Sequence, residues 1–335
     1  MKSLGAFLKK QKYSQHFILC DENTIKHCLP ILVAECRILE NAEIFEIESG
    51  EQSKTLNLCA QLWETLLSYN ADKNTVIINL GGGVISDLGG FIASTYKRGI
   101  DFINVPTTLL AMADASVGGK TGIDHAGLKN VVGTITQPKG VFIDTVFLNM
   151  LSSRHLANGM AEIYKMALIA DKSFWKQLNA AKVLDEKIVY RSVELKNKVV
   201  KKDPADKSVR KILNFGHTVG HAIESVLLAS EADILHGEAV IAGMICESYL
   251  AFRKKMLSKK ELDEVVNVLS SKFRLIPVPA LLFGEVIKAA LNDKKNTKQK
   301  IHCALINTIG SCKTDIPVDP MQIFDALEFY NSLIK

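Results

Sequence analysis

Residues 75–90 read TVIINLGGGVISDLGG, an apolar run that passes directly into three glycines. A strand that is covered on both faces is apolar at nearly every position, as the first six residues are. Glycines after such a strand let backbone N–H groups approach a pyrophosphate at the start of a helix, although a plain tight turn accounts for them equally well. The spacing from Gly81 is G-x-G-x-x-S, so the complete dinucleotide fingerprint is absent. The stretch predicts a buried parallel strand followed by a helix.

Short β-branched runs alternate with longer helical patterns on both sides of this stretch, through residues 15–145, which is typical of an α/β domain. From residue 151 onward amphipathic helices predominate, with one further strand. We therefore predict an α/β domain over residues 1–150 and a mainly α-helical domain over residues 151–335. The other expected strands are FILC at 17–20, EIFEI at 43–47, FINV at 102–105, GVFID at 140–144 and IHCALI at 301–306.

The composition is that of an ordinary globular protein, with 47% hydrophobic and 23% charged residues among 335. No run approaches the roughly 18 apolar residues of a membrane span, and the first residues lack the apolar core of a signal peptide. The net charge of +5 without a basic run disfavours nucleic acid as a partner and suits a small anionic substrate. The seven cysteines include no Cys-x-x-Cys pair, so we expect reduced thiols and a cytoplasmic protein.

A second cluster of glycines and lysines, DASVGGKTGIDHAGLKN at 114–130, follows the expected strand at 102–105. Its polar character predicts a flexible loop that carries Lys120 and Lys129. Loops at the carboxyl ends of strands bind ligands in α/β sheets, whereas the plainer alternative is a solvated surface loop.

The sequence KSVRKILNFGHTVGHAIES at 207–225 carries a stripe of polar residues in the second domain. Arg210, Asn214, His217 and His221 lie at i, i+4, i+7 and i+11, so they share one face if the whole stretch is helical. Apolar neighbours partly enclose this face, and an enclosed polar stripe favours a bound metal or anion. The alternative is an amphipathic helix whose polar face lies in water.

Charged residues in apolar surroundings at two further places strengthen the interpretation that this domain binds a metal or an anion. Lys196 shares its helical face with valines in EKIVYRSVELKNKVVKK, so it either meets an anion or extends to the surface. Glu162 and Lys165 lie one turn apart in the apolar segment NGMAEIYKMALIA, where a simple ion pair is the alternative. His236 precedes an apolar helix in LHGEAVIAGM. One glutamate and two or three histidines suit zinc, but spacing does not choose between His221 and His236 as the partner of His217.

Taken together, these segments resemble the 3-dehydroquinate synthase family of sugar-phosphate cyclases from about Asp21 to Lys295. The matching motifs are GGGVISDLGGFIASTYKRGI, VPTTLLAMADASVGGKTG, NGMAEIYK, RKILNFGHTVGHAIE and LHGEAVIAGM. The resemblance implies a Rossmann-like NAD-binding α/β domain, a helical domain that binds a divalent metal (zinc, or cobalt in its place), and a homodimer.

The resemblance also implies a role for individual residues. The metal ligands are Glu162, His217 and His236. Lys196 and Arg210 hold the substrate carboxylate, and Lys165 lies beside the reacting hydroxyls. The substrate phosphate is held by Lys120, Asn130, Asn214, His221, one lysine of 293–295 (Lys294 or Lys295) and Arg98 from the partner subunit. NAD is bound by Asp21, Asn23, Glu51, Lys54, Gly82, Gly83, Val84, Asp87, Thr107, Thr108, Asp114, Lys120 and Lys129.

The implied reaction converts 3-deoxy-D-arabino-heptulosonate 7-phosphate to 3-dehydroquinate and phosphate, in the shikimate pathway. It proceeds by transient oxidation with NAD, phosphate elimination, re-reduction and internal aldol closure at the metal. The alternatives are another sugar-phosphate cyclase, a metal-dependent NAD alcohol or polyol dehydrogenase, and an inactive relative that binds NAD or metal as a sensor. A simple dehydrogenase needs the metal and NAD but no carboxylate clamp, so the presence of Lys196, Arg210, Asn214 and His221 together argues against that alternative.

The chain departs from the family pattern at two places. His155 stands where relatives usually have glutamate, at the junction of the two expected domains, which puts one cofactor contact in doubt. Asp124 stands where relatives usually have asparagine, just before Lys129. The geometry of that loop is therefore expected to differ.

Overall fold

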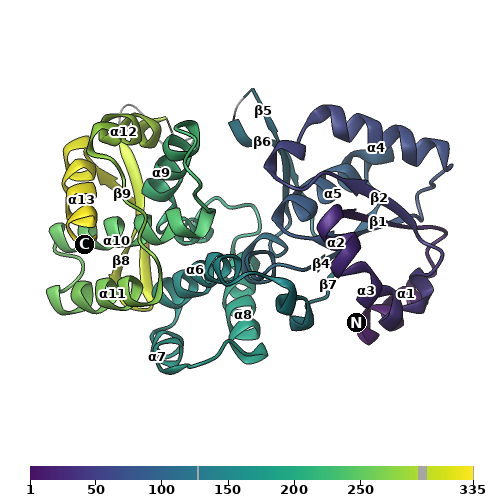
Figure 1. Ribbon diagram of the computed structural model, residues 1–335, viewed down its shortest axis with the longest axis horizontal. Helices are drawn as coiled ribbons and strands as arrows, with labels where there is room; N and C mark the ends of the chain where they lie inside the picture. Colours follow the sequence, from purple (N-terminus) through teal and green to yellow (C-terminus); the bar gives the residue numbers. More distant parts are fainter. Residues whose placement is uncertain (127, 293–299, 335) are drawn as a thin grey trace. The chain divides into compact units, whose positions relative to one another are not determined.

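The computed structural model describes residues 1–126, 128–292 and 300–334. Contacts within the chain separate two compact units, Met1–Leu156 and Ala157–Lys335, which follow one another along the colour bar of Figure 1. Among the described helices, none combines the length and the apolar character that a membrane crossing requires.

The first unit is built on a five-stranded parallel sheet with the strand order β2-β1-β3-β4-β7. Its strands are β1 His16–Asp21, β2 Glu43–Ile47, β3 Val76–Gly81, β4 Asp101–Pro106 and β7 Gly140–Val141. β3 is central and buried at every position, as its apolar sequence predicts. The five strands expected in this unit are confirmed, although only two residues of GVFID pair with β4.

α5 Gly83–Thr95 begins directly after the glycines and packs against β3, β4 and β1. Its Leu88 and Ile92 join Phe17, Ile77 and Phe102 in the core of this unit. The predicted order of strand, glycines and helix is therefore confirmed. The other helices here are α1 Lys2–Gln11, α2 Glu22–His27, α3 Leu29–Glu35 and α4 Leu56–Ser68, with short turns η1 Arg37–Leu39, η2 Glu51–Ser53, η3 Tyr96–Arg98, η4 Ala111–Ala115 and η5 Thr145–Met150.

The segment that carries Lys120 and Lys129 is a β-hairpin, so the expectation of a flexible loop is wrong. β5 Lys120–His125 pairs antiparallel with β6 Leu128–Ile135. Thr121 and Ile123 of β5 are buried, and the hydroxyls of Thr121 and Thr134 lie 2.8 Å apart across the pair. The expectation failed because three consecutive residues of β5, Thr121, Gly122 and Ile123, are buried, so the strand has no alternation of buried and exposed positions to reveal it.

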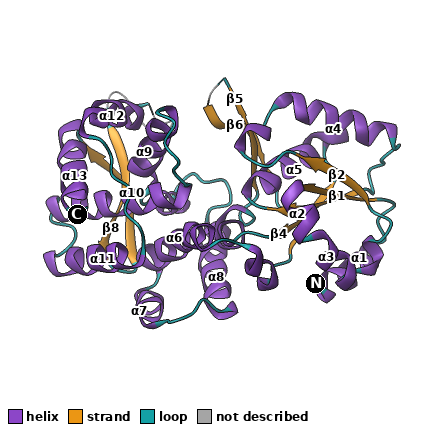
Figure 2. Cartoon of the chain, viewed as in Figure 1, coloured by secondary structure: helices purple, strands orange, loops and turns teal. Residues whose placement is uncertain are grey.

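The second unit is mainly helical and contains one antiparallel ribbon, as Figure 2 shows. Its helices are α6 Ser153–Ala170 (which begins in the first unit), α7 Lys172–Ala180, α8 Glu186–Lys202, η6 Val209–Asn214, α9 His217–Ala229, α10 His236–Arg253, α11 Lys259–Lys272, η7 Ala280–Leu282, α12 Phe283–Leu291 and α13 Pro320–Ser332. The ribbon consists of β8 Ile301–Thr308, which was expected, and β9 Ser311–Val318, which was not.

The stretch from Arg210 to His221 is not one continuous helix. η6 ends at Asn214, Gly216 adopts a left-handed conformation with φ of 77°, and α9 begins at His217. Arg210 and Asn214 therefore lie on one element and the two histidines on another. The single helical face expected for all four is wrong, because the left-handed glycine reorients the chain between them.

Candidate active site

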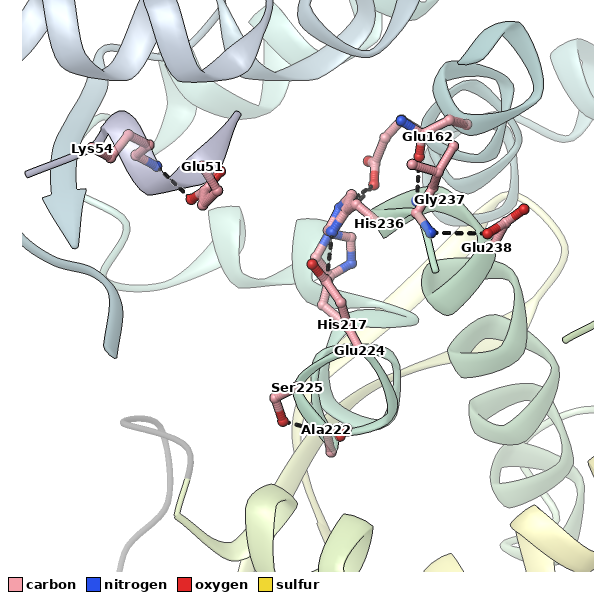
Figure 3. Close-up of polar contacts among 12 residues, drawn as sticks. Glu51, Lys54, Glu162, His217, Ala222, Glu224, Ser225, His236, Gly237 and Glu238 are labelled. Carbon is pink, nitrogen blue, oxygen red and sulfur yellow. Dashed lines mark hydrogen bonds and ion pairs between the residues drawn. The ribbon is translucent and has the colours of Figure 1, made fainter. Parts of the chain in front are cut away.

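Three helices of the second unit bring a carboxylate and imidazoles together. Glu162 lies in the middle of α6, His217 is the first residue of α9, and His236 is the first residue of α10. The Nε2 atoms of His217 and His236 lie 3.4 Å and 3.5 Å from Glu162 Oε1 (Figure 3). Glu162 is only 1% exposed, whereas the side chain of His236 is 28% exposed, so the cluster is buried at the glutamate and accessible at His236.

His221 belongs to the same cluster. One nitrogen from each of His217, His221 and His236 lies within 4.8 Å of the others. The structure therefore places both candidate partners, His221 and His236, beside His217. Glu162 lies against the rings of His217 and His236. A buried carboxylate with three imidazoles is a nitrogen and oxygen donor set of the kind that zinc prefers, so the residues present fit a divalent metal.

The two imidazoles beside Glu162 are oriented through their other ring nitrogens. His217 Nδ1 lies 3.1 Å from the carbonyl oxygen of Phe215, and His236 Nδ1 lies 3.0 Å from Glu224 Oε2. With Nδ1 of His217 donating, its Nε2 can act as a ligand toward the cluster. Burial would lower the pKa of His236, but Glu162 and Glu224 raise it to about 10, so a metal has to displace a proton from this ring. The sequence analysis does not single out Glu224; its signal is its position seven residues after His217 and three after His221, on one face of α9.

The charges of the cluster favour a negative Glu162 and a neutral His217. Burial alone would raise the pKa of Glu162, but Lys165 and His217 hold that pKa well below its usual range. Lys165 forms an ion pair with Glu162, and both side chains are buried. Burial, together with the charge of Lys165, lowers the pKa of His217. A carboxylate and a neutral imidazole are the forms that bind a metal.

The residues expected to hold the substrate carboxylate lie on α8 and η6. Lys196 and Arg210 are 4% and 3% exposed, so neither side chain extends into solvent. The loop between the two elements is organised by Asp203, whose Oδ2 accepts hydrogen bonds from the backbone N–H groups of Ser208 (2.6 Å) and Arg210 (3.1 Å). These hydrogen bonds and one from Lys207 hold the pKa of Asp203 at about 2. The sequence analysis did not identify Asp203.

Asn214 ends η6 and lines a small cavity of about 90 Å³ beside β8 and β9, together with Lys211 and His302. Lys294 and Lys295, the expected phosphate-binding lysines, lie outside the described residues. A larger cavity of about 240 Å³ is lined by Met160 and Tyr164 of α6, on a different face of the helix from Glu162 and Lys165. None of the expected site residues lines it.

In the first unit, Lys54 is the centre of a second cluster of charges. Its Nζ lies 3.0 Å from Asp87 Oδ2, 3.1 Å from Glu51 Oε1, 2.5 Å from Asn130 Oδ1 and 3.9 Å from Asp124 Oδ1. Burial would lower the pKa of Lys54, but Asp87 and Glu51 raise it. Burial raises the pKa of Asp87 to about 6 against the opposing effect of Lys54. Glu51 and Asp87 therefore both contact Lys54, and all three residues are expected to bind NAD.

The other expected NAD-binding residues gather at the carboxyl ends of three adjacent strands. Asp21 ends β1 and caps α2, accepting a hydrogen bond from the Thr24 N–H at 2.8 Å. Gly82 and Gly83 follow β3, and Thr107, which follows β4, donates its N–H to the Gly81 carbonyl at 3.0 Å. This edge of a parallel sheet is where α/β folds bind ligands. Also placed here are Asn23 on α2, Val84 on α5, Thr108 after β4 and Asp114 in η4.

Three expected residues are placed on the hairpin and in a turn. Lys120 is the first residue of β5, Lys129 lies on β6, and Arg98 ends η3 with φ of 64°. Of the two departures from the family pattern, Asp124 Oδ1 accepts the N–H of Asn130 at 2.8 Å and supports its left-handed backbone. His155 Nδ1 lies 2.9 Å from the Ser152 hydroxyl at the start of α6, so this side chain contributes to a local helix cap.

Comparison with known proteins identifies the relatives of this chain. The models of the 3-dehydroquinate synthase N-terminal and C-terminal domains match residues 44–158 and 159–296. A 3-dehydroquinate synthase of Parabacteroides distasonis is 37% identical over 340 residues, which cover 98% of this chain and 94% of the relative.

Two solved structures have a closely similar fold. A 2-deoxy-scyllo-inosose synthase complexed with carbaglucose-6-phosphate, NAD+ and Co2+ matches with a TM-score of 0.87 and 26% identity, over 98% of this chain and 94% of the other. ValA, the 2-epi-5-epi-valiolone synthase of Streptomyces hygroscopicus subsp. jinggangensis 5008 with NAD+ and Zn2+ bound, matches with a TM-score of 0.87 and 25% identity, over 99% and 94%.

The chain thus shares its fold with two sugar-phosphate cyclase structures that contain NAD+ and a divalent metal. Within this class, the chain belongs to the 3-dehydroquinate synthase family. The resemblance and the fold class predicted from the sequence motifs are thereby confirmed.

Proposed function

We propose that this protein acts as a 3-dehydroquinate synthase and converts 3-deoxy-D-arabino-heptulosonate 7-phosphate to 3-dehydroquinate and phosphate. The observation that carries the proposal is the cluster of Glu162, His217 and His236 in a chain of this family. The buried cations Lys196 and Arg210 in the same helical unit suit a substrate that carries a carboxylate.

The cofactors of the proposed reaction are NAD and a divalent metal. The two cyclase structures contain NAD+ with Co2+ and NAD+ with Zn2+, and the donor set of this chain fits such an ion. Glu162, His217 and His236 would hold the metal, and residues 1–150 would bind NAD at the carboxyl ends of β1, β3 and β4. The chemistry supplied when both groups are bound is hydride transfer to and from NAD and polarisation of a substrate hydroxyl by the metal.

The residues of the chain itself position the substrate and hold its charges. Lys196 and Arg210 bind the carboxylate through charge-assisted hydrogen bonds. Lys165, held against Glu162 by their ion pair, keeps a proton at Nζ beside the reacting hydroxyls. The phosphate is bound and stabilised as it leaves by Lys120, Asn130, Asn214, His221, Arg98 of a second subunit and Lys294 or Lys295.

The proposal is tested by following phosphate release and NADH absorbance together. Purified protein is incubated with 3-deoxy-D-arabino-heptulosonate 7-phosphate, zinc and NAD in a small molar amount. Many phosphates per NAD without accumulation of NADH, with 3-dehydroquinate as the product, are expected because the hydride is returned within each turnover. Steady accumulation of NADH would instead indicate an alcohol or polyol dehydrogenase. Folded, zinc-loaded protein that releases no phosphate would overturn the substrate assignment and favour a different cyclase.

We further propose that the protein is a cytoplasmic homodimer that pairs through its hairpin. Four large apolar side chains of β6 are exposed: Leu128 (57%), Val131 (39%), Val132 (40%) and Ile135 (53%). Exposed apolar residues on a strand edge favour pairing with another chain, and a second copy is the partner that the family resemblance implies. Ile135→Lys is expected to shift the protein from dimer to monomer in sedimentation velocity, whereas a wild-type monomer would refute the proposal.

The free state of all seven cysteines supports the cytoplasmic location.

A further inference from the structure

The helix that carries His217 and His221 begins without a cap of its own. Its N-cap residue is Gly216, which has no side chain to accept the unpaired N–H groups of the first turn. Serine, threonine, aspartate or asparagine usually fills this role. The start of α9 therefore depends on a group from elsewhere in the fold.

Glu247 of α10 supplies that group. It is completely buried, its Oε2 accepts the N–H of Gly216 at 2.6 Å, and its Oε1 accepts the N–H of Val219 at 3.1 Å. The carboxylate thus spans the N-cap and third positions of the helix, where negative charge is also favoured by the helix dipole. Glu247 lies three turns after His236 along α10, about 16 Å at 1.5 Å per residue.

The two helices approach each other so closely at this junction that the backbone has little freedom. A Cβ added at Gly243 would collide with the Gly216 carbonyl oxygen, and one added at Gly216 would collide with Met244. Gly216 is also the left-handed residue that separates η6 from α9. A carboxylate fixed on α10 therefore sets the position of the residues directly before and after Gly216.

We propose that Glu247 is a positioning residue of the metal site, acting through the first turn of α9. His217 directly follows Gly216, and its ring is oriented by the carbonyl of Phe215, which directly precedes Gly216. Loss of the Glu247 cap frays this turn and displaces His217 Nε2 from Glu162 before any metal arrives. The inference rests on the proposed metal site, and it assigns to Glu247 no contact with metal or substrate.

The test compares Glu247→Gln with Glu261→Gln. Glu261 is a matched control because it also accepts backbone N–H groups, from Ser258 and Ile309, at the start of α11, which carries no proposed ligand. Zinc affinity is measured for the full chain by competition with a chromophoric chelator, and thermal unfolding is measured with and without zinc. Visible absorption of the Co2+-loaded proteins reports the coordination geometry.

Glu247→Gln is expected to bind zinc at least tenfold more weakly, to gain less thermal stability from zinc and to show an altered Co2+ spectrum. Glu261→Gln is expected to be destabilised with unchanged zinc affinity. Wild-type zinc affinity in a folded Glu247→Gln protein would overturn the inference. If neither Glu247→Gln nor Glu247→Asp folds, the inference is also overturned, because Glu247 then serves the fold as a whole. A wild-type protein that binds no zinc would instead refute the proposed metal site.

Discussion

Glu224 and His236 illustrate how a residue outside the expected ligand set acts on the site. Glu224 is 8% exposed and holds His236 Nδ1 at 3.0 Å from a neighbouring helix. A carboxylate in this position fixes the ring orientation and makes the imidazole a better ligand. Loss of the Glu224 carboxylate should therefore affect metal binding through His236.

We therefore expect Glu224→Gln to weaken zinc binding by roughly 10-fold to 100-fold, the usual cost of removing such a partner. Chelator competition measures the affinity, and circular dichroism checks that the helices remain. Glu231→Gln, at an exposed position beyond the same helix, is the control and should bind zinc as the wild type does. Equal affinities in the two variants would show that His236 needs no carboxylate partner.

The ammonium group of Lys54, a residue that is 1% exposed, forms ion pairs with three carboxylates of the first unit. Lys54→Met leaves Glu51, Asp87 and Asp124 facing one another without a cation. Removing one partner of a buried ion pair costs about 3 kcal/mol of unfolding free energy or more. Urea unfolding should show this loss in Lys54→Met, while Lys26→Met at an exposed position of α2 should stay within about 0.5 kcal/mol. A comparably small loss in both variants would mean that solvent screens the cluster.

Asp87 should make the stability of the first unit depend on pH. Burial raises its pKa to about 6 in the folded chain, above the 3.8 that an exposed aspartate has, although Lys54 opposes the shift. Folding therefore favours the protonated form of Asp87. The contribution of this group to the unfolding free energy is complete below about pH 4 and is lost as the pH rises through 6. From pH 4 to pH 7 the unfolding free energy of the wild type should therefore fall relative to that of Asp87→Asn, because asparagine does not titrate. A difference that is constant from pH 4 to pH 7 would contradict the shift.

At the scale of elements, the crossing of α9 and α10 depends on glycine. The backbone of Gly243 lies against Gly216 and Gly220, and an added Cβ would meet backbone atoms of both. Backbone atoms cannot move aside as a flexible side chain can. The metal ligands at the starts of these two helices are brought together by this close approach.

Gly243→Ala should accordingly destabilise the protein by about 1–3 kcal/mol, the range for forcing extra volume into a packed core. Gly284→Ala in α12 is the matched control, since nothing lies within 4 Å of its added Cβ. That variant should be as stable as the wild type or more stable by about 0.5–1 kcal/mol, because alanine favours a helix. Chemical denaturation measures both. A neutral Gly243→Ala would mean that the two helices can separate at little cost.

At the scale of the whole molecule, the two units should respond separately to the two cofactors. A ligand slows local opening only in the part of the chain that its binding stabilises. In hydrogen exchange, NAD alone should protect the ends of β1, β3 and β4, and zinc alone should protect α6 and the starts of α9 and α10. Protection of the β3 segment by zinc alone, without NAD, would contradict the proposed division of the sites.

Much of this organisation can be predicted from sequence because it is local. The run at 75–80 is buried at every position of β3, and the glycines after it begin α5 as expected. The hairpin of β5 and β6 could not be recognised in the same way, since three consecutive residues of β5 are buried and the strand has no alternation of buried and exposed positions. β9 was missed although its exposure alternates from Cys312 to Val318, because the residues on its exposed face, Lys313, Asp315 and Pro317, are typical of a loop.

The family resemblance, the succession of an α/β and a helical unit, and the charged residues available to the site can all be inferred from the residues and their order. Three facts require the folded chain: His217, His221 and His236 share one cluster with Glu162, Glu224 orients one of these rings, and Glu247 caps the helix of another. This is because the periodicity of apolar residues indicates which face of a helix or strand is buried. A contact between two helices depends instead on where the second helix crosses the first, which periodicity does not indicate. Gly216 demonstrates this: one left-handed residue divides what the spacing predicts as a single helix, and only the folded chain shows where each half points.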